Sequence, residues 1–153
     1  MTTRESTHEN TPENMHENTR GSAPASTHGD GRPSAHGVVN IAEKLAGFTE
    51  QWAPHRIARV NDYEIKIAKV QGEFIWHTHE DTDELFLVVS GTLTIRLRAA
   101  DVVLNPGEIY VVPRGVEHCP QADGETAILL FEPVGTANTG GEVSDRTREP
   151  VDA

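Results

Sequence analysis

Cysteine is almost absent from this sequence of 153 residues, which contains only Cys119. No disulfide can form within the chain, and a reducing compartment is the natural setting for such a protein. Apolar runs are also short: the longest, Leu85–Val89 and Ala127–Phe131, have five residues each, whereas a membrane-spanning helix needs about 20. The first ten residues hold no apolar segment that could act as a signal peptide. We therefore expect a cytoplasmic protein without a membrane segment.

Positive charge is scarce as well. The sequence has 13 Lys and Arg residues against 24 Asp and Glu residues, which gives a formal net charge of −11. A protein that binds nucleic acid or an anionic membrane surface needs a basic face to neutralise phosphate groups. The charge therefore argues against both of these partners, and a small molecule remains the expected one.

Large apolar residues are missing from residues 1–36, which contain no Ile, Leu, Val, Phe, Trp or Tyr. Such a segment cannot bury enough apolar surface to offset the entropy lost on ordering, so we expect a disordered N-terminal tail. Four histidines in it could chelate a metal, but the composition favours an extension without a site: His8, His16, His28 and His36. Residues 136–153 are polar again and are expected to form a loose C-terminal tail. This leaves residues 37–135 as a single domain.

The predicted domain begins with a short helix and continues in strands. Asn40 is a suitable helix N-cap, and Gly47 and Pro54 limit the helix. After Pro54 the pattern alternates between apolar and polar residues with turn signals between the runs. We expect strands at residues 56–60, 63–70, 84–98 (interrupted by a turn at Ser90-Gly91), 101–104, 108–113 and 126–133. Short strands without further helical periodicity predict an all-β sandwich or barrel.

Three histidines and one glutamate are candidate metal ligands. His77 and His79 are separated by one residue, and side chains at this spacing on a strand point to the same face. Glu84 follows after a short polar segment, and His118 comes after a later strand. Three nitrogens and one carboxylate oxygen suit Fe, Mn, Ni, Co or Zn better than Ca or Mg. Spacing alone leaves a second interpretation open, in which these are ordinary strand and turn residues.

Glycines and a proline surround these four residues in a specific order. The first series is G-x4-H-x-H-x4-E-x6-G, from Gly72 to Gly91, and the second is G-x5-P-x-G-x2-H, from Gly107 to His118, with 15 residues between them. The two series resemble the signature motifs of the cupin superfamily, and the short spacing resembles the small single-domain bacterial cupins of the cupin-2 type. Two departures are visible: Gly72 is one residue closer to the histidines than usual, and Ala122 stands where the second motif usually ends in Asn.

The resemblance implies a cupin-type jelly-roll β-barrel in which His77, His79, Glu84 and His118 bind one divalent transition metal ion per chain. Cupins include dioxygenases, isomerases and non-catalytic binders. We therefore expect a metal-dependent oxidoreductase or isomerase that acts on a small molecule; some such cupins are described as similar to mannose-6-phosphate isomerase. The alternative is a non-catalytic module that binds a metal or small ligand. Tyr110 is a candidate for a catalytic group if its phenol faces the pocket; the alternative is that the phenol points outward.

Two further expectations concern surfaces. Small cupins commonly pair through their sheets, and Leu85, Leu87 and Val89 alternate with inward-facing residues, so they supply an apolar outer face. We therefore expect a homodimer. Lys66, Lys69 and Arg96 are candidate contacts for an anionic ligand, or surface residues whose stems cover apolar groups.

Overall fold

The computed structural model describes residues 37–153 of the chain. The predicted disordered tail and its four histidines, at positions 8, 16, 28 and 36, lie outside the described residues. Among the described residues, no helix is long and apolar enough to cross a membrane.

A single turn-and-a-half of helix precedes the strands. This helix is α1 (Ile41–Ala46). The Asn40 side chain accepts hydrogen bonds from the backbone N–H groups of Ala42 and Glu43. This satisfies two of the donors that have no partner at a helix start. The predicted N-cap is therefore confirmed, and the chain leaves the helix at Gly47.

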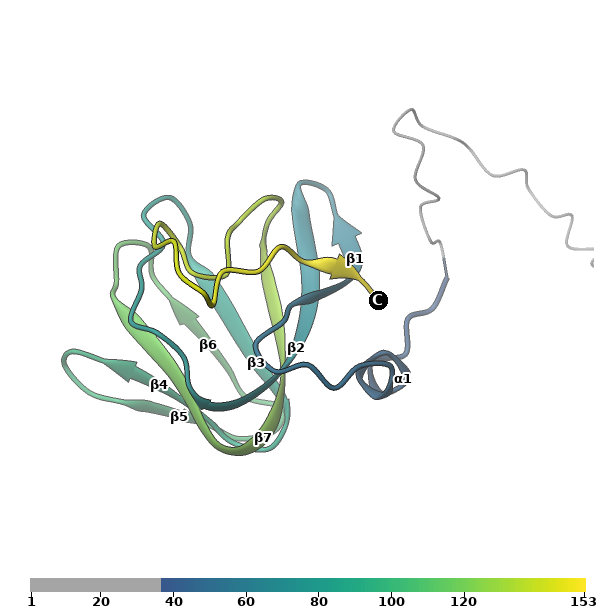
Figure 1. Ribbon diagram of the computed structural model, residues 1–153, viewed down its shortest axis with the longest axis horizontal. Helices are drawn as coiled ribbons and strands as arrows, with labels where there is room; N and C mark the ends of the chain where they lie inside the picture. The colour runs from purple at the N-terminus through teal and green to yellow at the C-terminus, as the bar shows by residue number, and fades with distance from the viewer. Residues whose placement is uncertain (1–36) are drawn as a thin grey trace, which may run out of the picture. The chain divides into compact units, whose positions relative to one another are not determined.

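The rest of the described chain is mainly strand (Figure 1). The strands are β1 (His55–Val60), β2 (Tyr63–Glu73), β3 (Glu84–Ser90), β4 (Leu93–Leu97), β5 (Val102–Leu104), β6 (Ile109–Val112), β7 (His118–Pro133) and β8 (Val151–Asp152). Each predicted strand is present, so the all-β prediction is confirmed. Strand β7 begins at His118 and not at residue 126 as expected. The first residues of β7 pair with β4, but the polar first half of the strand does not show the apolar alternation from which a strand is predicted.

Strand β7 connects the two parts of the sheet. Residues 121–133 of β7 pair with β2, residues 118–121 pair with β4, and residues 127–131 pair with β3. The strand order is β5-β4-β7-β2-β1-β8, and β6 is attached through β3. Gly91, between β3 and β4, has φ +84° and lies directly against Thr126 of β7.

The interior is formed by alternate residues of the central strands. On β3, Glu84, Phe86 and Val88 are buried while Leu85, Leu87 and Val89 are only half-buried, so the predicted alternation is confirmed. One continuous cluster of buried apolar side chains fills the interior: Trp52, Ala68, Val70, Phe74, Phe86, Val88, Leu93, Ile95, Leu104, Val112, Ala122, Ile128 and Leu130. Burial of this surface is the main stabilising contribution to a fold of this size.

The segment after Pro133 differs from the loose tail that its composition predicts. Thr139 is fully buried, Val134 N donates to Asp62 O (2.9 Å), and β8 pairs in parallel with β1. In Figure 1 this yellow segment returns from the end of β7 to β1. Its polar side chains are ordered by hydrogen bonds to its own backbone, and a hydropathy pattern does not reveal bonds of this kind.

Candidate metal centre

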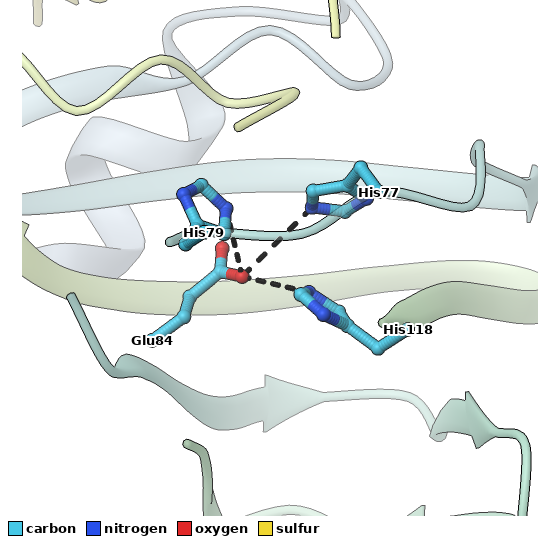
Figure 2. A group of neighbouring side chains, drawn as sticks. All are labelled: His77, His79, Glu84 and His118. Atoms are coloured by element: carbon cyan, nitrogen blue, oxygen red, sulfur yellow. Dashed lines mark hydrogen bonds and ion pairs between the residues drawn. The ribbon is translucent and has the colours of Figure 1, made fainter. Parts of the chain in front are cut away.

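The four predicted ligand residues lie together in the barrel interior (Figure 2). His77 and His79 come from the connection between β2 and β3, while Glu84 and His118 are the first residues of β3 and β7. His77 and His118 face each other across an isolated bridge with two backbone hydrogen bonds of 3.0 Å. One potential ligand atom from each residue lies within 4.8 Å of all the others. All four residues are at most 6% exposed.

Backbone carbonyls orient two of the imidazoles. His77 Nδ1–H donates to Ile75 O and His118 Nδ1–H donates to Val116 O, each at 3.0 Å. An imidazole that donates through Nδ1 carries, when neutral, a lone pair on Nε2. Such a hydrogen bond is the usual way in which a protein fixes the tautomer of a metal-binding histidine. In both residues the lone pair therefore points toward Glu84.

In the centre, the Nε2 atoms of the three histidines lie around the Glu84 carboxylate, and too few hydrogen-bond donors are present to satisfy these acceptor atoms. The distances to Glu84 Oε2 are 2.8 Å from His118 Nε2, 3.3 Å from His79 Nε2 and 3.9 Å from His77 Nε2. The Nε2 atoms of His77 and His79 are buried and have no aligned hydrogen-bond partner. Nitrogen and oxygen ligands that are each about 2.1 Å from one ion lie roughly 3–4 Å apart. The residues therefore fit a divalent cation, which would satisfy all four atoms at once.

Burial and the glutamate charge separate the protonation behaviour of these residues. Burial lowers the pKa of His77 to about 4, although the charge of Glu84 opposes this shift. For His79 burial also acts to lower the pKa, but the interaction with Glu84 outweighs it and the pKa is raised. Burial would raise the pKa of Glu84, yet its contacts with His118 and His79 dominate and lower the pKa to about 2. Glu84 is therefore a carboxylate at neutral pH.

A small, mainly apolar cavity of about 40 Å³ adjoins the centre. His77 and Glu84 form part of its wall, together with Trp52, Pro54, Ala68, Val70, Phe74, Phe86, Pro120, Ile128, Leu130 and Asn138. Trp52 stacks on Phe74 (4.8 Å between ring centroids), and Phe74 meets the His77 ring edge-on at 5.5 Å. Trp52 holds the unusual φ of +58° and donates its indole N–H to Gln71 O. The aromatic wall therefore fixes one side of the His77 ring.

Buried charges beside the centre were not predicted. Glu64, Lys66 and Glu132 are each 1% exposed, and Lys66 Nζ donates to Glu132 Oε1 at 2.8 Å. Burial and the charge of Glu84 raise the pKa of Glu132 to about 7. The burial of Glu64 and Lys66 could have been predicted from the alternation of β2, because both residues share a face with Ala68 and Val70. Lys66 is thus an interior ion-pair residue and not a surface cation.

The other named candidates do not join the group of four. Tyr110 packs against the apolar core and is absent from the wall of the described cavity. Lys69 Nζ donates to Phe48 O at 2.9 Å, and Arg96 pairs with Glu73 at the surface. Neither cation faces the centre in the described part of the chain.

Comparison with known proteins agrees with this fold and site. The Cupin_2 family model, described as a cupin domain, matches residues 63–132. A crystal structure of a cupin-2 domain containing protein from Shewanella frigidimarina NCIMB 400 is 49% identical, with a TM-score of 0.62, over 63% of this chain and 94% of that one. The uncharacterized protein YdbB of Bacillus subtilis (strain 168) is 34% identical over 84 residues, which are 54% of this chain and 74% of YdbB.

A plant protein is also similar. Auxin-binding protein ABP20 of Prunus persica is 33% identical over 95 residues, which cover 56% of this chain and 44% of that protein. The chain therefore matches less than half of the length of this relative.

The fold and the centre together define a small β-barrel with a buried cluster of three histidines and one glutamate. The chain belongs to the cupin superfamily and is of the cupin-2 type found in small bacterial cupins. The predicted cupin-type jelly-roll barrel is thereby confirmed.

Proposed function

We propose that His77, His79, Glu84 and His118 bind one divalent transition metal ion. One observation supports the proposal most strongly: the buried Nε2 atoms of His77 and His79 lie near Glu84 Oε2 and have no aligned hydrogen-bond partner. Unsatisfied polar atoms in a protein interior cost free energy, and a bound cation removes this cost. The donor set suits Fe, Mn, Ni, Co or Zn.

The proposed activity is that of a metal-dependent enzyme, an oxidoreductase or isomerase, on a small molecule. A metal held by four protein ligands supplies Lewis-acid or redox chemistry to a ligand that binds at its free positions. The chain contributes the orientation of three imidazoles, the charge of Glu84 and an interior that excludes water. The apolar wall formed by Trp52, Phe74 and Phe86 favours a ligand with an apolar body and an oxygen donor at one end.

A non-catalytic cupin that binds a metal or a small ligand is the second candidate function. It is favoured by the scarcity of acid–base groups in the cavity beyond the four proposed ligands, because its other described wall residues are apolar apart from Asn138 and Trp52. The two functions differ in one result: an enzyme converts its ligand or consumes oxygen, whereas a binding module returns the ligand unchanged.

Titration of the metal-free protein with Co²⁺ tests the metal site. We expect visible absorption that saturates at about one equivalent per chain, as four protein ligands around one ion require. Glu84→Gln keeps the shape of the side chain but removes its charge, so its titration should be weaker and its spectrum shifted. A parent protein whose absorption does not saturate would contradict the proposal.

We also propose that the described residues act as one cupin domain and that two chains form a homodimer. The outer face of β3 and β6 supports this, because Ile109 and Val111 are 57% and 41% exposed beside the half-buried Leu85 and Leu87. An apolar sheet face of this kind commonly marks a protein interface.

A further inference from the structure

The centre is closed in this structure. Its four side chains are at most 6% exposed, and the adjoining cavity has a volume of only about 40 Å³. Pockets that hold small-molecule ligands usually have at least roughly 300 Å³. A ligand larger than a few water molecules therefore cannot reach the centre unless part of the protein moves.

Residues 134–150, which we name the strap, contribute one residue to the wall of this cavity. Asn138 lies in the cavity wall with His77 and Glu84, and Thr139 beside it is fully buried. Gly140 approaches the peptide between the two histidines so closely that a Cβ atom there would lie 2.0 Å from Thr78 O. The strap therefore contacts the segment that carries His77 and His79.

The two ends of the strap are fixed to the barrel. At its start Val134 N donates to Asp62 O at 2.9 Å. At its end β8 pairs with β1, and Asp152 forms an ion pair with Arg56 at 2.5 Å. Gly135, with φ +85°, follows the first anchor, and this conformation suits a bend in the chain.

Between the anchors the strap is bonded to itself more than to the barrel. Asn138 donates to Arg146 O (3.0 Å) and accepts from Arg148 N (2.9 Å), and Thr139 Oγ1 lies 2.9 Å from Thr147 Oγ1. Thr136 donates to Pro133 O at the end of β7, through its N (3.2 Å) and its Oγ1 (2.8 Å). Among the described residues, the other hydrogen bonds to the barrel here are two long ones of 3.4 Å: Gly141 N to Thr78 O, and Lys66 Nζ to Thr136 O. The strap can therefore lift as a unit at the loss of few bonds.

We propose that the strap is the gate of the ligand-binding cavity and that the contact of Gly140 with Thr78 holds the gate closed. The proposal rests on the proposed function, because a gate has a role only where a ligand binds. Glycine is required at position 140 for two reasons: its φ is +60°, and the Thr78 carbonyl leaves no room for a side chain. Opening exposes the aromatic wall and the His77 and Glu84 side chains together.

Chemical labelling of the histidines tests the gate in the full-length, metal-free protein. Diethylpyrocarbonate modifies accessible imidazoles, and mass spectrometry gives the rates at His77, His79 and His118 relative to His55, which lies outside the cavity wall. The matched variants are Gly140→Ala and Gly141→Ala, since a Cβ atom at Gly141 would meet nothing within 4 Å. We expect the relative rates to rise roughly tenfold in Gly140→Ala and to stay within about twofold of the parent in Gly141→Ala.

Unchanged relative rates in Gly140→Ala, or equal increases in both variants, would overturn the proposal. If Gly140→Ala does not fold, amide hydrogen exchange of the parent protein tests the gate instead. A gate requires the amides of residues 141–148 to exchange much faster than those of residues 127–131 in β7, and equal protection would overturn it. Both measurements use the protein without metal, so they can fail or succeed independently of the metal-binding proposal.

Discussion

At the scale of single residues, His77 and His79 both face Glu84 but differ in their electrostatics. Each directs Nε2 toward Glu84, but the pKa of His77 is lowered to about 4 while that of His79 is raised. Burial is the largest cause of the low pKa of His77, whereas the closer carboxylate raises the pKa of His79: its Nε2 is 3.3 Å from Glu84 Oε2, and His77 Nε2 is 3.9 Å from it. Of these two residues, His79 should therefore be the first to bind a proton that competes with a metal ion.

This order gives a prediction for metal release by acid. A lower pH places a proton on the His79 lone pair, so metal occupancy should fall as the pH drops from about 7 to about 5, near and below the ordinary histidine pKa. Glu84 stays charged throughout this range, because its pKa is about 2. Metal content after dialysis at a series of pH values measures the effect. Occupancy that persists until about pH 4 would instead assign the first protonation to His77.

The identity of the four residues could be predicted from the sequence, but their protonation could not. The i, i+2 spacing of His77 and His79 and the surrounding glycines indicated a common site. The hydrogen bonds from His77 to Ile75 O and from His118 to Val116 O depend on the backbone path two residues earlier, and no residue pattern records it.

At the scale of strands, one row of the barrel carries three buried glutamates on neighbouring strands. Glu64 pairs with Glu132, and because Leu85 pairs with Phe131, Glu84 is the neighbour of Glu132 on the other side. Lys66 lies 2.8 Å from Glu132 and 3.4 Å from Glu64, so it neutralises part of this row. Like charges at such spacing are destabilising without a counter-ion.

Lys66→Met should consequently destabilise the protein. The substitution leaves Glu132 buried without its partner, and the loss of one member of a buried pair costs about 3–5 kcal/mol. The folded-state pKa of Glu132, about 7, lies above the value of 4.5 for an unperturbed glutamate, and the substitution removes a positive charge that lowers it. Stability is then lost as the pH rises, so the loss should be larger at pH 8 than at pH 5.5.

Urea unfolding of Lys66→Met at the two pH values measures this effect. The double variant Lys66→Met, Glu132→Leu is the control, since it removes both charges and keeps the Arg56–Glu64 pair, and it should recover most of the loss. A Lys66→Met protein as stable as its parent at pH 8 would show that the pair contributes nothing.

The turn between β3 and β4 gives a second prediction for strands. Gly91→Ala forces a side chain onto a residue with φ +84° and places Cβ 2.4 Å from Thr126 Oγ1 and 2.8 Å from Thr126 Cα. We expect a loss of at least about 2 kcal/mol in the free energy of unfolding. Gly124→Ala is the control, because a Cβ there meets nothing within 4 Å, and it should change stability by less than about 0.5 kcal/mol. Similar losses in both variants would contradict this account.

The strands were predictable because alternation and turn residues are local signals. The hairpin at Asn61-Asp62 and the turn at Ser90-Gly91 are where the sequence places them. The strap was not predicted, because Asn138, Thr139 and Thr147 are ordered by bonds among themselves and not by apolar burial. A polar segment of this kind cannot be told from a loose tail by composition.

At the scale of the whole molecule, the proposed homodimer follows from the outer face of β3 and β6. Sedimentation at low micromolar concentration should give about twice the mass of one chain. Ile109→Lys and Val111→Lys should shift the protein to the monomer, because a charge in an apolar interface is costly to desolvate. Thr94→Lys, on β4 and outside this face, should sediment as the parent does. A parent protein that sediments as one chain would rule the dimer out.

The metal content of the purified protein tests the central claim most directly. The protein should be produced without added metal or a histidine tag, dialysed, and analysed by mass spectrometry beside His79→Ala and His55→Ala. We expect about one transition metal ion per chain in the parent and in His55→Ala, and little in His79→Ala, which lacks one of the four ligands. Equal metal in the parent and His79→Ala would mean that the ion binds elsewhere. That result would contradict both the proposed metal site and the metal-dependent activity that rests on it.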